Sequence, residues 1–173
     1  GLSITTKTHD ANTSATVTGT GTLSGVLQAD SANVVFNYAH GVGGLGATFV
    51  DANAGVNKSV TLTGVTLGGS AAGNYTLTGI AGLTGTIDRA QLTATLANQT
   101  KVYDQSTAAS IAAGNILLTG FVSGQGATVG ATTGAYDSKD VFSVTSVSAN
   151  LTTGVGGNVT ANNGTLLSNY VLP

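Results

Sequence analysis

Apolar residues recur at every second position in several short runs of the chain. In residues 33–38, NVVFNY, the side chains of Val34, Phe36 and Tyr38 share one face of an extended strand, while Val35 lies on the other. β-Branched and aromatic residues fill these runs, and they favour a pleated backbone. The pattern predicts many short β-strands.

A change of apolar phase marks the run 58–67, KSVTLTGVTL. Val60 and Leu62 share a face, but beyond Gly64 the apolar positions move by one residue to Val65 and Leu67. An extra residue in one strand of an antiparallel pair produces such a shift. We therefore predict a β-bulge at Gly64.

The run 140–151, DVFSVTSVSANL, has the same shift and predicts another strand. Its apolar faces are formed first by Phe142 and Val144 and then by Val147, Ala149 and Leu151.

Two further segments predict local structure. Asn163-Gly164 in the run ANNG is typical of a type I′ hairpin between two strands. The segment 106–115, STAASIAAGN, is the one helix candidate. It aligns with the strand-like segment 13–19, TSATVTG, so we predict a strand with at most one helical turn.

The sequence contains two related blocks. Lys7, His9 and Asp10 align with Lys101, Tyr103 and Asp104, each 94 positions later, and GNYTL at 73–77 aligns with SNYVL at 168–172, 95 positions later. Two separate matches at nearly one offset indicate tandem repeats long enough to hold their own cores.

We predict an all-β fold of two similar modules in tandem, residues 1–88 and 89–173. Each is expected to be an immunoglobulin-like or Greek-key β-sandwich. A β-grasp-like module with one short helix is the alternative. The polar run 88–91 predicts a tight turn at the junction, and so short a connection favours an elongated rod. The second repeat has no counterpart of residues 78–88, so we expect it to be truncated and to lack an edge strand.

The composition excludes several classes of function. Only 7% of the residues are charged, and five Lys and Arg cannot form the basic patch that nucleic acid requires. No apolar run is long enough for a membrane span. The chain has no cysteine, which excludes disulfides and cysteine-based zinc sites. A protein this poor in charge favours an extracellular setting.

Several of these elements resemble a known family. They are the Lys-x-Tyr-Asp start of the second repeat, the loop FVDANAG at 49–55, the valine-rich VTLTGVTLGG, AGNYTL, and the junction IDRAQL. Together they resemble the YDG and MBG repeats of filamentous-haemagglutinin-like adhesins, which Gram-negative bacteria export by two-partner secretion. The Tyr-Asp-Gly of the family reads His9-Asp10-Ala11 in the first repeat and Tyr103-Asp104-Gln105 in the second.

The resemblance implies a secreted protein at the bacterial cell surface that acts in adhesion or biofilm formation. We expect the repeats to form a non-catalytic stalk whose partners are neighbouring repeats of the same chain. The alternative is a carbohydrate-binding module for exopolysaccharide or a host glycan. The resemblance implies no catalytic residue and no cofactor.

Two recurring pairs in each repeat are candidate ligand-binding residues. They are His9 and Asp10 with Tyr103 and Asp104, and Asn74 and Tyr75 with Asn169 and Tyr170. An exposed tyrosine can stack on a sugar ring, and an amide can bond its hydroxyl groups. However, residues that recur in a repeat are more often structural, because every copy must build the same turns. We favour the structural reading.

The loop 51–57, DANAGVN, places oxygen ligands at alternate positions and is a weak calcium candidate. Asp51, Asn53 and Asn57 could contribute ligands, but only one of them is a carboxylate and no bidentate Glu follows. A plain turn is the favoured interpretation, and we predict no metal site.

Catalysis has little support in the sequence. The two histidines are His9 and His40, and no nucleophile motif accompanies either. His40 lies in the glycine-rich run AHGVGGLG, which lacks the Lys-Ser/Thr of a phosphate-binding loop. We therefore predict that the protein is not an enzyme.

Overall fold

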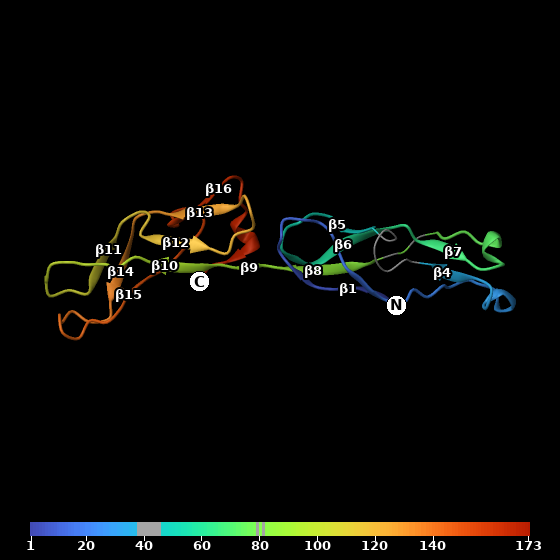
Figure 1. Cartoon of the computed structure of the whole chain (residues 1–173), viewed down its shortest axis with the longest axis horizontal. Helices are drawn as coiled ribbons and strands as arrows, with labels where there is room; N and C mark the ends of the chain where they lie inside the picture. The colour runs from blue at the N-terminus through green and yellow to red at the C-terminus, as the bar shows by residue number, and fades with distance from the viewer. Residues whose placement is uncertain (38–45, 79, 81) are drawn as a thin grey trace. The chain divides into compact units, whose positions relative to one another are not determined.

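A computed structural model describes residues 1–37, 46–78, 80 and 82–173 (Figure 1). The chain divides into two compact units, Gly1–Asp88 and Arg89–Pro173. Within the described residues every regular element is a β-strand or a single 3-10 turn, so the predicted all-β fold is confirmed. Tyr38 and His40 lie outside the described residues.

Unit 1 consists of short strands and two 3-10 turns. Its elements are β1 (Leu2–Ile4), β2 (Lys7–Thr8), β3 (Val17–Gly19), η1 (Gln28–Asp30), β4 (Val35–Asn37), β5 (Gly46–Phe49), β6 (Gly55–Thr63), β7 (Thr66–Gly68), η2 (Ala72–Asn74) and β8 (Thr84–Asp88).

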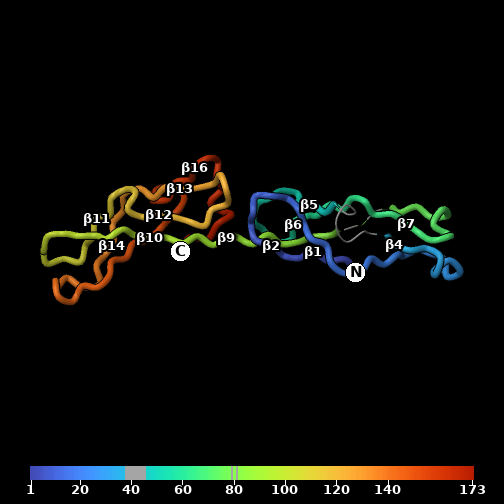
Figure 2. Tube along the Cα trace, viewed as in Figure 1, coloured from blue at the N-terminus to red at the C-terminus, as the bar shows by residue number. Residues whose placement is uncertain are grey.

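The main sheet of unit 1 has the strand order β2-β8-β6-β5. β8 runs parallel to β2 and antiparallel to β6, and β6 is antiparallel to β5. Two smaller ladders, β1–β3 and β4–β7, complete the unit. In Figure 2 the β4–β7 ladder lies at one end of unit 1 and the main sheet towards the other. The parallel pairing of β2 with β8 was not predicted.

The core of unit 1 lies against this sheet. β5 alternates exposed and buried residues, which points Ala47 and Phe49 inward to meet Val17, Val60 and Ile87. Complete burial of one large aliphatic or aromatic side chain stabilises a fold by about 1.5–3 kcal/mol. These few side chains therefore supply much of the stability of a unit this small.

The predicted bulge at Gly64 is wrong, although the phase shift is real. β6 ends at Thr63, Gly64 takes a φ of +81°, and β7 begins at Thr66. β6 pairs with β5 and β8, whereas β7 pairs with β4. The chain leaves one ladder at Gly64 and enters another, which accounts for the shift of the apolar positions. The register irregularity of β6 lies instead between Gly55 and Lys58.

Unit 2 is built from the same kinds of element. They are β9 (Ala90–Gln91), β10 (Thr93–Leu96), β11 (Ala108–Ile111), β12 (Ile116–Thr119), β13 (Gly126–Val129), β14 (Thr132–Tyr136), β15 (Val147–Ala149), β16 (Val159–Asn162), η3 (Leu167–Asn169) and β17 (Tyr170–Val171). β11 lies within the helix candidate 106–115, so the prediction of a strand there is confirmed.

The strands of unit 2 pair in four groups. β14 lies between β11 and β15, β10 pairs with β12, β13 pairs with β16, and β9 runs parallel to β17. The larger of its two cores contains Ile111, Ile116, Leu118, Val129 and Val159. A smaller cluster is made of Ala90, Leu92 and Tyr170.

Three local predictions in this half need correction. The first part of 140–151 is not a strand: residues 141–143 form a turn, and Phe142 is fully exposed. The amides of Ser143 and Val144 both donate to the carbonyl of Asp140 over 3.0 Å, which closes that turn. The strand begins only at Val147.

The predicted junction turn at 88–91 is also wrong, because β8 ends at Asp88 and β9 begins at Ala90. The ANNG prediction is half right. Asn163 and Gly164 have φ values of +52° and +70°, as a type I′ turn requires. However, β16 before the turn pairs with β13, and no strand follows directly to make a hairpin.

Candidate functional site

A lysine and an aspartate form the same turn in both units. Lys7 Nζ lies 2.7 Å from Asp10 Oδ1, and Lys101 Nζ lies 2.7 Å from Asp104 Oδ1. Each ammonium also donates to two backbone carbonyls beyond the turn, at 12 and 14 in unit 1 and at 106 and 108 in unit 2. The lysine thereby gives each of these carbonyls a hydrogen-bond donor.

The aspartate of each turn also fixes the backbone. Asp10 accepts the amide hydrogen of Asn12 over 3.1 Å, and Asp104 accepts that of Ser106 over 3.0 Å. The residue between has a positive φ, +62° at Ala11 and +64° at Gln105. Neither residue is glycine, so each unit keeps this backbone shape without the residue that adopts it most easily.

The environment of Asp104 strongly favours its charged form. The ammonium of Lys101, with the backbone N–H and hydroxyl of Ser106, lowers the pKa of Asp104 from 3.8 to about 2. Internal donors thus occupy Oδ1 of this carboxylate.

His9 and Tyr103 stand at equivalent positions in very different surroundings. His9 is 5% exposed, and its Nδ1 lies 2.9 Å from the carbonyl oxygen of Ala52. Tyr103 is 55% exposed. The structure therefore places the histidine in a packing role and leaves the tyrosine available to a partner.

Tyr75 and Tyr170 make the same pair of contacts in their units. The hydroxyl of Tyr75 accepts the amide hydrogen of Leu27 over 3.2 Å and donates to Asp30 Oδ2 over 2.8 Å. In unit 2 the hydroxyl of Tyr170 accepts the amide hydrogen of Val122 over 3.2 Å and donates to Gln125 Oε1. Each tyrosine ties a distant loop to the last part of its module.

The ring environments of the two tyrosines differ. Tyr170 is 3% exposed and packs edge-on against Phe121, with ring centroids 4.9 Å apart. Tyr75 is half-buried, and the nearby carboxylate of Asp30 raises the pKa of its hydroxyl. The preceding asparagines differ as well: Asn169 is buried, whereas Asn74 is exposed.

The calcium candidate loop holds an internal cation. Lys58 Nζ lies 2.7 Å from Asp51 Oδ1, the same oxygen that accepts the amide hydrogen of Asn53 over 2.7 Å. The bond from Lys58, together with that from Asn53, lowers the pKa of Asp51. Asn57 has a φ of +53° and shapes the strand entry. The only carboxylate of this trio thus already has a positive partner.

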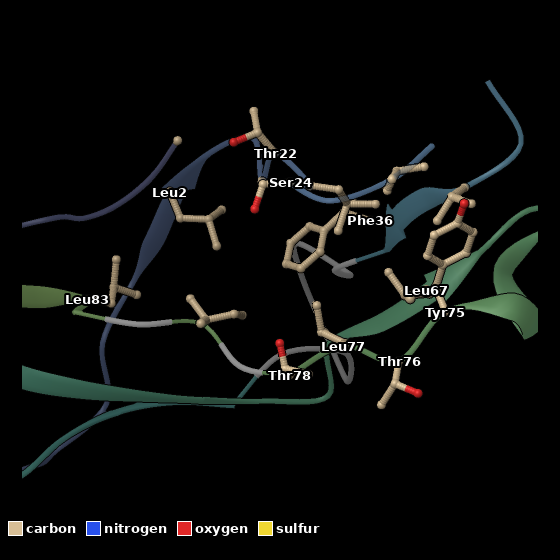
Figure 3. A pocket seen from close by; sticks show the side chains of 16 residues that line it. Leu2, Thr22, Ser24, Phe36, Leu67, Tyr75, Thr76, Leu77, Thr78 and Leu83 are labelled. Atoms are coloured by element: carbon tan, nitrogen blue, oxygen red, sulfur yellow. The ribbon is translucent and has the colours of Figure 1, made fainter. Parts of the chain in front are cut away.

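A cavity of about 330 Å³ opens in unit 1 between its two ends. Phe36 lies in the middle of its lining, with Leu2 and Leu83 on one side and Leu67 and Tyr75 on the other (Figure 3). The lining also includes four serine and threonine side chains: Thr22, Ser24, Thr76 and Thr78. An aromatic ring and hydroxyl groups in one cavity are chemically suited to a sugar ring.

Sequence reasoning missed several residues of these contacts. Asp30 and Gln125 stand 95 positions apart, and each accepts the hydroxyl hydrogen of the tyrosine in its own unit. Because their side chains differ in charge, the sequence alone does not reveal that the two positions correspond. Asp137 was not among the predicted site residues. Its carboxylate accepts hydrogen bonds from Thr145 and Ser146, with the hydroxyl of Thr145 foremost, and these hold its pKa well below the usual range.

In the part of the chain that the structure describes, no three His, Asp or Glu side chains gather as a metal site would require. No helix among those residues is long and apolar enough to cross a membrane.

Two tandem all-β units, each held by its own Lys–Asp turn and its own tyrosine contact, define a class of small repeat modules. Comparison with family models identifies the family to which these modules belong. The YDG domain model matches residues 1–82 and again 88–173, so the chain belongs to the YDG domain family and contains two such domains. No curated protein and no solved structure matches the chain.

Proposed function

We propose that the two YDG domains are non-catalytic structural repeats in the stalk of a large secreted adhesin at the bacterial surface or in the biofilm matrix. The observation that carries this proposal is that one lysine and one tyrosine recur in both modules and are engaged inside their own module. Lys7 and Lys101 bind their own turns, and Tyr75 and Tyr170 bind their own loops. Residues retained in both copies for construction are expected of a spacer.

The adhesin context rests on the resemblance of the repeats to those of filamentous-haemagglutinin-like proteins. The complete open reading frame tests it. Further YDG copies beside these two, together with a two-partner secretion domain, would support the proposal. A single pair of YDG domains fused to an enzyme would contradict it.

Carbohydrate binding is the second candidate function, and two observations favour it. The cavity of unit 1 combines the Phe36 ring with four hydroxyl-bearing side chains, and Tyr103 of unit 2 presents an exposed ring. Either could stack on a sugar.

A glycan array and a pull-down with matrix polysaccharide separate the two functions. A pure stalk gives no saturable binding to either. Saturable binding that Tyr103→Ala or Phe36→Ala weakens at least about tenfold, with the fold intact by circular dichroism, would establish the second function. Phe142→Ala is the matched control, because it removes another exposed aromatic ring.

A further inference from the structure

The turn after β16 contains the Asn-Gly pair of the chain. Asn163 is followed by Gly164, whereas every other asparagine of the sequence is followed by a residue that carries a side chain. The amide carbon of an asparagine side chain and the backbone nitrogen of the next residue can close a ring, and a side chain on that next residue hinders the closure. Asn163 is therefore the asparagine whose neighbour obstructs this reaction least.

Both residues of this pair are open to solvent. Asn163 and Gly164 are exposed, with φ values of +52° and +70°. Apart from the chain neighbours, no atom lies within 4 Å of the Cβ that a larger residue would carry at Gly164. Neither the side-chain amide of Asn163 nor the backbone N–H of Gly164 forms a hydrogen bond with another described residue. No such bond has to break before the nitrogen approaches the carbon.

Thr165 holds this turn in place of a second strand. β16 pairs with β13, and the next element along the chain is η3, so no ladder spans Asn163 and Gly164. The amide of Thr165 donates to the carbonyl of Asn162 over 2.9 Å. Its hydroxyl donates to the same carbonyl over 2.6 Å and accepts the amide hydrogen of Gly126 over 2.8 Å. The turn can thus open locally while the β13–β16 ladder stays paired.

We propose that Asn163 is a site of spontaneous covalent modification, at which the chain converts this asparagine into aspartate and isoaspartate. The backbone nitrogen of Gly164 gives up its proton and forms a bond to Cγ of Asn163. The bond from Cγ to the side-chain nitrogen breaks, and that nitrogen leaves as ammonia. Water then adds to either carbonyl of the cyclic imide and reopens it. One carbonyl gives aspartate and the other gives isoaspartate, and the reaction requires no oxidant and no cofactor.

Asn57 provides a comparison within the same chain. It is exposed and has a φ of +53°, so it shares the left-handed backbone conformation of Asn163. The residue after it is Lys58, whose Nζ lies 2.7 Å from Asp51 Oδ1. The backbone nitrogen that would attack Asn57 therefore has a fixed side chain beside it. Exposure and conformation are matched at the two asparagines, and the residue that follows is what differs.

The isoaspartate product changes the backbone where Thr165 is held. Its main chain runs through the former side chain, which adds a carbon between β16 and Thr165. Thr165 is 5% exposed and contacts Gly126, which pairs with Asn162 at the end of the β13–β16 ladder. We therefore expect isoaspartate to loosen this end of the ladder. Aspartate leaves the backbone unaltered and adds a negative charge. Neither effect depends on the stalk role proposed above.

Incubation of the folded full chain in mildly alkaline buffer tests the proposal. Samples taken over time are digested, and liquid chromatography with tandem mass spectrometry follows the conversion at each asparagine. We expect Asn163 to convert at least about tenfold faster than Asn57, because glycine leaves the attacking nitrogen unobstructed. Incubation in water enriched in heavy oxygen should label the product at Asn163, since hydrolysis of the imide takes an oxygen atom from water.

The isoaspartate fraction, separated by ion exchange, reports the structural consequence. Its unit 2 should melt about 4–8 °C lower, as loss of roughly one hydrogen bond implies. The amides of Gly126 and Thr165 should lose protection from hydrogen exchange, while those of unit 1 should not change. Asn163→Gly is the matched control, because glycine adopts a positive φ readily but cannot form the imide. Its melting temperature should stay constant throughout the incubation.

Two results would overturn the proposal. One is conversion of Asn163 in the folded chain at the same rate as that of Asn57, because the turn would then protect the pair. The other is an isoaspartate fraction that melts and exchanges like the unmodified chain, because Thr165 would then hold the turn whatever the length of the backbone before it.

Discussion

Tyr75 donates its hydroxyl hydrogen to Asp30 Oδ2 over 2.8 Å, across 45 residues of chain. Tyr170 makes the corresponding bond to Gln125 across the same separation. In both units the backbone N–H that the tyrosine accepts lies 48 residues before it. The geometry is thus retained although one acceptor is charged and the other neutral, so position and not charge is what the module requires.

Removing either hydroxyl should destabilise the unit that contains it. We expect Tyr75→Phe and Tyr170→Phe to lower the free energy of unfolding by about 1–2 kcal/mol, because each leaves an amide and an oxygen acceptor without a partner. Tyr170→Ala should cost about 3–5 kcal/mol, since the ring is buried. Urea unfolding followed by circular dichroism measures these differences.

Asp30→Gln is the matched control for the tyrosine contact, because unit 2 uses glutamine at this position. It should change the stability of unit 1 by less than about 0.5 kcal/mol. A loss as large as that of Tyr75→Phe would show that the charge of Asp30 matters after all.

Glycine should stabilise the two turns in which Ala11 and Gln105 have positive φ. A residue with a Cβ loses about 1–2 kcal/mol in this conformation, and the greater freedom of glycine in the unfolded chain returns about 0.4–1 kcal/mol. We therefore expect Ala11→Gly and Gln105→Gly each to add about 0.5–1 kcal/mol to the stability of the respective unit. Differential scanning calorimetry should show a melting temperature higher by about 2–5 °C.

Ala94→Gly is the control for this prediction, because Ala94 lies exposed in β10 and has no positive φ. It should destabilise unit 2 by about 0.5–1 kcal/mol. If the three glycine variants all lose stability, the turns do not have the backbone conformation described here.

The sequence predicted the strands and the repeat better than the pairing between strands. Alternating residues such as Val34 and Phe36 report on local geometry, and the structure shows that alternation. Gly64 shows what the pattern cannot predict. A shift in apolar phase looks the same whether a strand bulges or the chain passes to another ladder, and only the pairing of β6 with β8 and of β7 with β4 distinguishes the two. The fully exposed Phe142 was misplaced for a similar reason, since an apolar residue in a turn looks like one in a strand.

For the candidate sites, too, the sequence predicted some features and not others. Asp10 and Asp104 were correctly matched in the sequence, and both form the same turn. His9 is 5% exposed and Tyr103 is 55% exposed, and the His9 ring contacts the carbonyl oxygen of Ala52, 43 residues along the chain, so local sequence could not reveal its burial. Asp30 and Gln125 were not predicted because they differ in residue type. What they share is their position 45 residues before the tyrosine whose hydroxyl they accept.

Gly85 is required by the close packing of β8. A Cβ at this position would lie 2.5 Å from Ile4 Cγ2 and 2.9 Å from Phe49 Cε1. We expect Gly85→Ala to destabilise unit 1 by about 1–3 kcal/mol, since the side chains on both sides must shift. Thermal unfolding of the full chain measures this.

Gly126→Ala is the control for Gly85, because nothing lies within 4 Å of the Cβ it would add. It should leave the stability of unit 2 unchanged or raise it by up to about 1 kcal/mol. Equal losses at both glycines would mean that the tight contact at β8 is not what determines the result.

The Lys101–Asp104 pair should make unit 2 sensitive to acid. The pKa of Asp104 is about 2 in the fold against 3.8 unperturbed, so its charged form stabilises the fold above pH 3.8. That contribution is lost as the pH falls from 3.8 through about 2, and Asp137, whose pKa is also lowered, acts in the same direction. We expect a steady melting temperature from about pH 7 to 5 and a fall between about pH 4 and 2.

Lys101→Met should lower the melting temperature at neutral pH and make the fall in acid shallower, because the cation foremost in lowering the pKa of Asp104 is gone. Lys139→Met removes an exposed lysine of the same unit and should retain the steep fall. Parallel acid curves for Lys101→Met and the unaltered chain would show that the ion pair does not stabilise the turn.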